Sequence, residues 1–439
     1  MCGMVSEETR IADTRTGMSS TERGTTARAE PREAPPARAW TTRLVVAGIV
    51  LSALNLRPAI TSLGALLQEV RDGLGMSGGV AGLLTSVPPL CFAVFGVTAA
   101  RLARRFGPAA VVCAGMAAIT TGLLIRPYAG GTAGFLAFSA LALMGIAVSN
   151  VLMPVIVKRW FPDRVGSMTG LYSMALALGT SAAAAVTVPV TDALGGDWHT
   201  GLVVWAGLAA AAVLPWVPLV RERGTAPAPV PAQQPAREPE PAATRLRITR
   251  SRTAWALAVF FGLQATAAYI TMGWMAQIFR DAGVAAGTAG LLLAVTMVMG
   301  VPLAFVIPRI AARLPHQGPI VLVLGLCGLA GYAGLYLAPA GGAWAWAILL
   351  GVSNCAFPLA LTMVGMRART GPGVAQLSAF AQSTGYLISI PGPLLVGVLY
   401  QHSGGWGLPI ALMAALMVPQ MAVGVLAGRD RTVEDEAAR

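Results

Sequence analysis

The sequence has few charged residues for its length. Asp, Glu, Lys and Arg make up 11% of its 439 residues, hydrophobic residues make up 55%, and the mean hydropathy is +0.67. Soluble globular domains carry about 25% charged residues, so this composition excludes that class. The net charge of +12 does not indicate a nucleic-acid partner, because the basic residues are not gathered in one domain.

Groups for catalysis and metal binding are also sparse. The three histidines (His199, His316 and His402) lie far apart, and the five cysteines show no close ligand spacing. No phosphate-binding Walker loop is present. We therefore expect no enzyme activity, no cofactor, no metal site and no ATP-driven transport within this chain.

Apolar blocks of about 20 residues, separated by short polar breaks, are typical of transmembrane helices. Twelve spans are predicted, at 44–67, 79–100, 108–126, 132–156, 165–190, 199–220, 253–277, 284–307, 319–338, 343–366, 374–400 and 408–428. Residues 1–40 lack an apolar segment and predict a disordered cytoplasmic tail rather than a signal peptide. Residues 221–252, with six prolines between 227 and 241, predict a solvated linker, and 429–439 a second cytoplasmic tail.

Basic residues in the breaks indicate the orientation of the helices. Seventeen lie in the breaks on the side of the linker, whereas the opposite breaks hold three, Arg71, Arg126 and Arg280. The positive-inside rule then places both termini and the linker in the cytoplasm, in a multi-pass protein of the plasma (inner) membrane.

The two sets of six helices resemble each other. Val148-Ser149-Asn150 and Pro154 are repeated as Val352-Ser353-Asn354 and Pro358, and the basic motif of 101–105 is repeated at 309–313. These matches predict duplication of a six-helix unit. The expected fold class is therefore all-α integral membrane, with twelve transmembrane helices in two pseudo-symmetric halves, 41–220 and 253–428, as in the major facilitator fold.

Arg57 is the one charged residue predicted to lie deep in the membrane, near the middle of span 44–67. A centred arginine costs about 2.5–3.5 kcal/mol on insertion scales, so its presence needs a reason. All Asp and Glu residues fall in loops, tails or helix ends, with Glu69 and Asp72 nearest. An incoming anion would supply the missing counter-charge. Alternatively, Pro58 frees a backbone carbonyl, and local carbonyls and water satisfy Arg57.

Polar residues in other spans are predicted to complete the substrate site. Asn150 and Asn354 occupy equivalent places, with an interhelical hydrogen bond as the alternative role. Gln382 belongs to a polar stripe on one helix face, which indicates a cavity lining or, alternatively, helix packing. The predicted set is Arg57, Asn55, Asn150, Tyr172, Gln264, Tyr269, Asn354 and Gln382.

Two segments resemble the cyanate permease family, a branch of the major facilitator superfamily that includes 2-nitroimidazole transporter relatives. They are LNLRPAITSLGALL (54–67) and GIAVSNVLMPVIVKRWFPDRVGSMTGLY (145–172), and the resemblance extends over all twelve predicted helices. It implies transport of a small, often anionic or nitro-bearing solute, with Arg57 as the residue carried over.

The predicted gating loop, Arg101, Arg104 and Arg105, departs from the superfamily pattern G-x-L-A-D-R-x-G. Arg104 stands where the pattern has Asp, so the acidic gate contact is missing and helix C-terminal carbonyls are the expected partners.

Together these features predict a monomeric secondary or facilitative transporter, embedded in the lipid bilayer, that moves a small anionic solute by alternating access. A multidrug-type efflux transporter of the same fold is the first alternative. A non-transporting membrane sensor or scaffold is a weaker alternative, because no folded input or output domain accompanies the helices.

Overall fold

The computed structural model describes residues 36–221 and 248–437, which form helices joined by short turns. Residues 1–35 of the predicted N-terminal tail and 222–247 of the predicted linker lie outside the described residues.

The described residues 36–221 of the first half form nine α-helices, and four of the six predicted spans there are single helices. Its helices are α1 (Pro36–Asn55), α2 (Pro58–Ala65), α3 (Leu67–Leu74), α4 (Gly78–Phe106), α5 (Pro108–Ile125), α6 (Thr132–Trp160), α7 (Val165–Ala193), α8 (Trp198–Val213) and α9 (Trp216–Arg221).

A larger number of spans is interrupted in the second half, with breaks at Met299, Cys355 and Ile390. Each break comes shortly before a proline, which cannot donate a hydrogen bond to the preceding turn. Its helices are α10 (Arg252–Asp281), α11 (Ala286–Val298), α12 (Gly300–Arg313), α13 (Gly318–Leu337), α14 (Ala343–Asn354), α15 (Ala356–Met366), α16 (Gly371–Ser389), α17 (Pro391–Ser403), α18 (Gly407–Ala427) and α19 (Val433–Ala437).

Each predicted span corresponds to one helix or to consecutive helices. Eleven segments of the described chain are long and apolar enough to cross a membrane. The predicted span 199–220 corresponds to the shorter α8, which continues as α9 after a break at Leu214 and Pro215. The protein is thus a multi-pass membrane protein.

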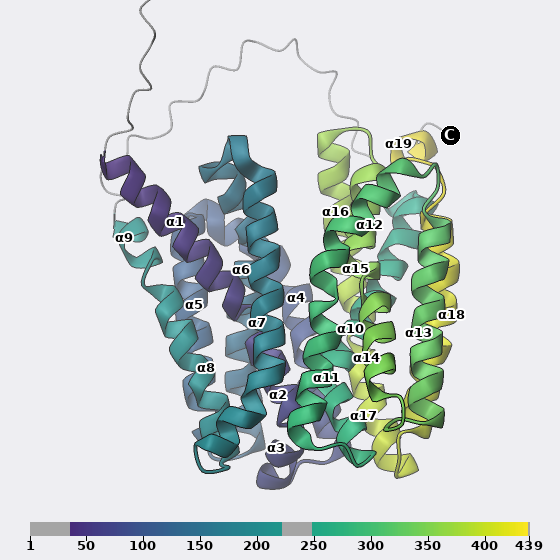
Figure 1. The fold of residues 1–439 in the computed structure, drawn as a ribbon. Helices are drawn as coiled ribbons and strands as arrows, with labels where there is room; N and C mark the ends of the chain where they lie inside the picture. The colour runs from purple at the N-terminus through teal and green to yellow at the C-terminus, as the bar shows by residue number, and fades with distance from the viewer. Residues whose placement is uncertain (1–35, 222–247, 438–439) are drawn as a thin grey trace, which may run out of the picture.

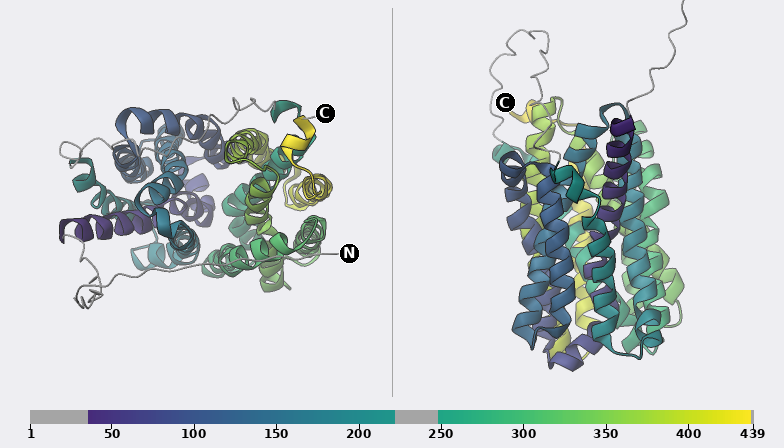
Figure 2. Two further views of the ribbon diagram at one scale, coloured as in Figure 1. Left: turned by 90° about the horizontal axis from the view of Figure 1, so that it is seen from above. Right: turned by 90° about the vertical axis from the view of Figure 1, so that its left-hand side faces the viewer.

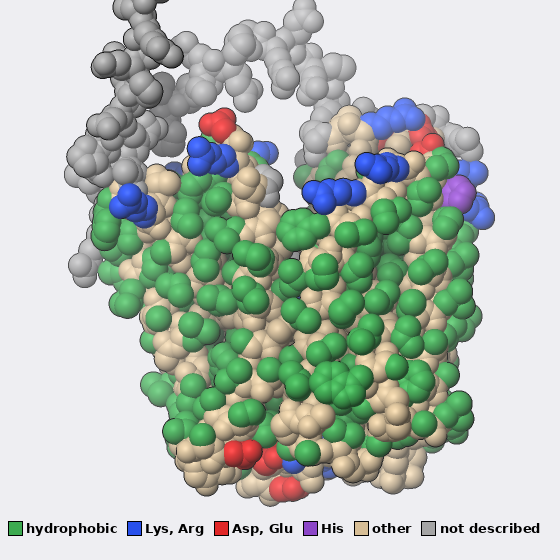
Figure 3. All heavy atoms as spheres, in the orientation of Figure 1, with side chains coloured by type: hydrophobic (Ala, Val, Ile, Leu, Met, Phe, Trp, Pro, Cys, Tyr) green, Lys and Arg blue, Asp and Glu red, His purple; other side chains and the backbone are tan. Residues whose placement is uncertain are grey.

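The two halves stand side by side as separate bundles, which is clear along the bundle axis and from the side (Figures 1 and 2). The start of α1, the end of α9, the start of α10 and α19 all lie at one end, which we call the linker end. The opposite end, with turns near residues 75, 195, 283 and 404, we call the far end. Exposed Lys and Arg side chains gather at the linker end (Figure 3).

The halves are held together mainly towards the far end. There Arg280 of α10 makes a two-pronged ion pair with Glu69 of α3, at 2.7 and 2.9 Å. Gln401 of α17 accepts a hydrogen bond from the Gly79 backbone at 2.9 Å. At the linker end, Figure 3 shows a notch between the halves.

The linker end of the second half is closed by residues of the predicted C-terminal tail. Helix α19 lies against the start of α10, where Glu436 accepts hydrogen bonds from Ser251 (2.6 Å) and Thr253 (2.8 Å). Burial raises the pKa of the Glu436 carboxyl, but these hydrogen bonds outweigh it and hold the pKa below its usual value. Part of the segment 429–439 is therefore docked on the bundle.

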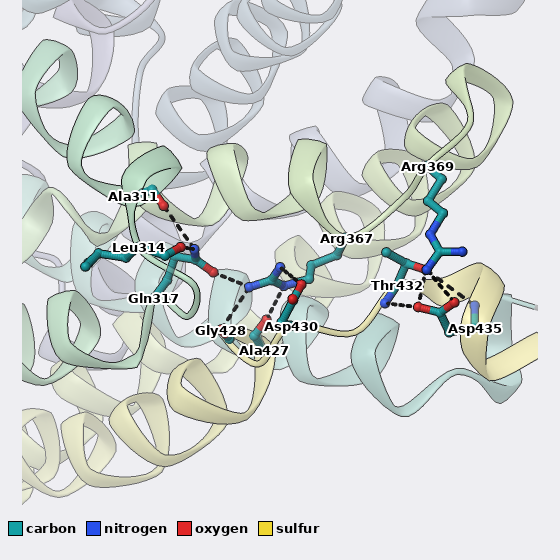
Figure 4. A network of polar contacts seen from close by, with 10 residues as sticks. All are labelled: Ala311, Leu314, Gln317, Arg367, Arg369, Ala427, Gly428, Asp430, Thr432 and Asp435. Atoms are coloured by element: carbon teal, nitrogen blue, oxygen red, sulfur yellow. Dashed lines mark hydrogen bonds and ion pairs between the residues drawn. The ribbon is translucent and has the colours of Figure 1, made fainter.

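Arg367, expected in a solvated break, is buried with 2% exposure. Its guanidinium donates to the carbonyls of Ala427 (3.0 Å) and Gly428 (2.8 Å) and to the Gln317 side chain (Figure 4). Asp430 lies 3.9 Å away. Burial lowers the pKa of Arg367, and the nearby carboxylate partly opposes this. Arg367 is buried because the chain turns back after α18 and covers the end of α15 with carbonyls.

Candidate substrate site

The first predicted span is broken in its middle, at the position of Arg57. Helix α1 ends at Asn55, and α2 begins at Pro58, which occupies the first helical position. Proline lacks the N–H that would continue the helix, so the carbonyl of Leu54 has no helical partner. Gly179 of α7 packs directly on this break, since a Cβ atom there would lie 2.1 Å from the Leu54 oxygen. The sequence thus presents Arg57 from a tightly supported kink rather than from a straight helix.

Arg57 lies between the two halves and is half-buried. Its Nη1 lies 3.9 Å from the Met272 sulfur, and the Tyr269 hydroxyl is a second polar neighbour of the guanidinium. Its charge interacts with the phenol groups of Tyr172, Tyr269 and Tyr386, from α7, α10 and α16. Within residues 36–221 and 248–437, no carboxylate lies within ion-pair distance of Arg57. Arg57 is therefore a cation between the halves, within electrostatic reach of three phenols and without an ion-pair partner in the described part of the chain.

Two of the predicted site residues meet in the first half. The Tyr172 hydroxyl donates to the Asn150 side-chain oxygen, which links α7 to α6. Both side chains are half-buried, and Tyr172 is also one of the residues that interact with Arg57. Asn150 is thus placed to orient Tyr172 beside the central charge.

Two others meet in the second half. Gln264 of α10 donates to the side-chain oxygen of Asn354 at 2.9 Å and to its backbone carbonyl at 3.0 Å. Its own oxygen accepts from Gln420 of α18 at 2.8 Å. Gln264 is 1% exposed, so this network of hydrogen bonds holds neighbouring helices together. Asn354 is half-buried and is the more accessible of the two predicted residues.

Asn55 and Gln382 differ in their burial and in their hydrogen-bond partners. Asn55 is 1% exposed and donates to the carbonyls of Leu51 (2.8 Å) and Leu208 (3.1 Å), so it packs against α8. Its role as a substrate contact stays a prediction. Gln382 donates to Ser378, one turn earlier on α16, at 2.7 Å, and is half-buried.

Tyr386 was not among the predicted residues, yet it lies at the interface between the halves. Its ring stacks on Phe92 of α4 with centroids 5.0 Å apart, and it meets Phe261 edge-on at 5.2 Å. It follows Gln382 by four residues, so it extends the polar stripe already visible on that helix face. That spacing was the signal available in the sequence.

The predicted gating residues Arg101, Arg104 and Arg105 lie in the last two turns of α4 at the linker end. All three are exposed, and Arg105 stacks over the ring of Phe106 at 5.2 Å. No hydrogen bond in the described chain joins them to the second half. Their gating role stays a prediction for a conformation in which this end is closed.

Arg126 lies in the turn between α5 and α6, the break in which it was expected, but it is buried there. It sits where α5 ends and is 2% exposed. Its Nη1 donates to the Ala59 carbonyl at 3.1 Å, and its guanidinium lies 5.7 Å from the centre of the Phe135 ring. The apolar span ends at Arg126 in sequence, but α2 and α6 extend past it in space and enclose it.

Comparison with known proteins agrees with this architecture. The family model of the Major Facilitator Superfamily matches residues 48–372. The chain is 35% identical to the uncharacterized transporter YycB of Bacillus subtilis, over 89% of this chain and 94% of that protein. It is 32% identical to the 2-nitroimidazole transporter of Escherichia coli (89% and 96% covered) and 29% identical to its cyanate transport protein CynX (85% and 94%).

Solved structures share the fold at low sequence identity. A bacterial homologue of the human lysosomal transporter Spinster has a TM-score of 0.65 at 16% identity, covering 90% of this chain and 96% of that one. The nucleoside transporter NupG has a TM-score of 0.67 at 14% identity, covering 89% and 99%. The predicted major facilitator fold is thereby confirmed, and the chain belongs to the major facilitator superfamily, in the group that contains the 2-nitroimidazole and cyanate transport proteins.

Proposed function

We propose that this protein moves a small planar solute, anionic or nitro-bearing, across the plasma membrane by alternating access, acting as a monomer. Arg57 binds the charged or nitro group, and the surrounding tyrosines hold the rest of the solute. The observation that carries the proposal is the half-buried Arg57 guanidinium, which lies between the halves with no carboxylate partner among residues 36–221 and 248–437.

The chemistry of the surroundings favours an acceptor-rich solute. Guanidinium donors match two oxygens of one carboxylate or nitro group, and phenol hydroxyls add further donors. The stacked rings of Phe92 and Tyr386 at the interface between the halves provide an aromatic surface against which a flat ring or a small linear anion would pack. The relatives named for 2-nitroimidazole and cyanate transport have solutes of these shapes.

The same arrangement disfavours multidrug efflux as the main activity. A broad exporter of hydrophobic cations needs an apolar cavity or a buried acid, whereas the centre here carries a permanent cation. The acid nearest to Arg57 in the sequence, Glu69, is already paired with Arg280. We therefore propose anion exchange, co-entry of a proton carried by the solute, or facilitated entry, and no proton relay through a central carboxylate.

The orientation follows from charge. With the basic linker end in the cytoplasm, the notch between the halves opens inward and the Glu69–Arg280 pair closes the outer end. The expected cycle breaks this pair and closes the linker end around Arg101, Arg104 and Arg105. Cysteines placed in the linker should resist a membrane-impermeant label applied to intact cells.

The test of function is solute-dependent stabilisation followed by uptake. Purified protein is screened by thermal shift with cyanate, nitrate, 2-nitroimidazole and small carboxylates, and uptake of the stabilising compound is measured in proteoliposomes. Arg57→Ala should abolish saturable uptake. Arg57→Lys should impair it, because lysine keeps the charge but loses the two-pronged donor geometry.

Arg159→Ala is the matched control, since Arg159 is an exposed arginine at the linker end of α6. It should transport as the parent protein does at equal membrane abundance. Wild-type uptake by Arg57→Ala would show instead that Arg57 only supports the kink between α1 and α2, and the proposal would fail.

A further inference from the structure

A second cation is buried between the central site and the far end. Arg126 has three nitrogens that can donate, and within the described part of the chain only Nη1 has a partner, the Ala59 carbonyl. Nε and Nη2 are buried and have no hydrogen-bond partner. These two nitrogens lie on the same edge of the guanidinium, which is the edge that grips two oxygens of one anion. No carboxylate of the described chain lies within ion-pair distance of it.

Arg126 lines a small enclosed space. Its lining comes from α2, α4, α6 and α10 and is otherwise mostly apolar, with Thr85 and Tyr269 as two of the polar members. Ser139 of α6 is a third, and its hydroxyl is also buried without a partner. In this conformation the space is about large enough for one water molecule. A buried cation and a buried hydroxyl thus both lack partners around one cavity.

The cavity and the central site share one residue, Tyr269, which lines the cavity and also interacts with Arg57. On the other side, α10 continues from Gly273, which lines the cavity, to Arg280, which closes the far end. The cavity therefore lies on the axis between Arg57 and the Glu69–Arg280 closure.

Close backbone packing keeps the cavity small in this conformation. A Cβ atom at Gly64 of α2 would lie 2.0 Å from the Met272 carbonyl oxygen of α10. One at Gly273 would lie 2.7 Å from the Thr85 side chain of α4. Both contacts join the first half to the second, so separation of the halves at the far end would widen the space beside Arg126.

We propose that Arg126 and Ser139 form a second anion site, which takes a planar oxyanion such as nitrate or a small carboxylate when the far end opens. An unpaired buried cation is costly, and a bound anion would remove that cost. The existence of the site stands on Arg126 and Ser139. Its role as an outer station for the transported solute rests on the proposed function of Arg57.

The test measures nitrate-dependent thermal stabilisation of the full-length protein in detergent. Sodium gluconate at equal ionic strength is the reference, because its anion is too large for the cavity. Arg57→Ala removes the central site and should still show saturable stabilisation by nitrate. Adding Arg126→Met should raise the half-saturating nitrate concentration about tenfold or more, which is the usual effect of losing hydrogen bonds to a charged group.

Ser139→Val provides a second variant in case Arg126→Met is poorly folded. In the Arg57→Ala background it should raise the half-saturating nitrate concentration about threefold to tenfold. Leu143→Met, at another lining position of the cavity, is the control and should leave nitrate binding within about twofold.

The outcomes separate the two proposals. If Arg57→Ala protein shows no response to nitrate, or if neither Arg126→Met nor Ser139→Val changes its half-saturating concentration, the second site is refuted. If Arg126→Met alone removes the whole nitrate response while Arg57→Ala leaves it intact, the second site stands and the central anion site fails. A purely structural Arg126 would lower Tm without changing the nitrate dependence.

Discussion

Arg126 and Arg367 are buried to the same extent but are satisfied very differently. Each is 2% exposed. Arg367 donates to two carbonyls and to Gln317, with Asp430 nearby, whereas Arg126 donates to one carbonyl and leaves two nitrogens without partners. Where this fold buries an arginine as a structural element, it surrounds the guanidinium with acceptors. The incomplete shell around Arg126 therefore indicates a different use.

Arg57 forms a third case. It is only half-buried, lies between the halves, and has a thioether and phenols around it instead of carbonyls or carboxylates. In the described chain, the three guanidinium groups thus form a series in which the number of carbonyl and carboxylate acceptors decreases from Arg367 through Arg126 to Arg57. The expected effects on stability decrease along that series, whereas the expected effects on anion binding increase.

The largest loss of stability is expected for Arg367→Met. The substitution leaves the Gln317 side-chain oxygen and the Ala427 carbonyl without this donor in a buried place and leaves the Gly428 carbonyl with only the Gln317 backbone N–H among the described residues, which should cost about 3–5 kcal/mol. Thermal unfolding in detergent, followed by tryptophan fluorescence, measures it. Arg369→Met, two residues on and exposed, is the matched control and should change stability by less than about 1 kcal/mol. Equal Tm values for the two variants would show that the acceptors around Arg367 do not stabilise the fold, which would contradict the comparison with Arg126.

Gln317→Leu should have an intermediate effect. Arg367 keeps both carbonyls, but one acceptor is lost, and the carbonyls of Ala311 and Leu314 lose the Gln317 amide donor. We expect about 1–3 kcal/mol of destabilisation by the same unfolding measurement. A loss as large as that of Arg367→Met would mean that the glutamine, rather than the carbonyls, is the main partner.

Arg126→Met should change stability by no more than about 1 kcal/mol. It removes one hydrogen bond to Ala59, but it also removes a buried charge that lacks acceptors, and the two effects oppose each other. Unfolding of this variant beside Arg367→Met compares the two buried arginines directly. A loss of 3 kcal/mol or more, on the order expected for a broken buried pair, would class Arg126 with Arg367 as structural.

The smallest effect is expected for Asp430→Asn. The Asp430 side chain is 84% exposed and 3.9 Å from Arg367, so solvent screens most of their attraction. Stability should change by less than about 0.5 kcal/mol. A drop in Tm like that of Gln317→Leu would show that charge pairing, and not the carbonyl cage, holds Arg367.

Much of the architecture could be predicted because it depends on local sequence. Apolar blocks of spanning length marked the helices, and Pro58 marked the interruption beside Arg57. The absence of a nearby acid was also readable, since every Asp and Glu lies in a loop, tail or helix end. The pairing of Asn150 with Tyr172 and of Gln264 with Asn354 joined residues that had been selected only as polar positions in apolar helices.

Other features could not be read from sequence position. The repeated Asn and Pro of the two halves lie in one continuous helix, α6, but flank a break between α14 and α15. Asn55, beside the central arginine in sequence, faces α8 instead, because the helix turns by a fixed angle per residue and the break lies after it. Side-chain direction at an interrupted helix depends on the neighbours that pack against it.

The hydropathy of the chain alone determines which segments enter the membrane, because transfer of an apolar block depends on its own length and composition. It also identifies Arg57 as a candidate site residue, because its charge lies inside such a block. Only the tertiary structure decides the environment of Arg126 and Arg367, since both stand at the ends of apolar spans and look like loop residues. Packing of α2 and α6 around one, and the return of the chain after α18 over the other, buries them. Burial at a helix end depends on how far neighbouring helices extend beyond it, which is a property of the assembled bundle.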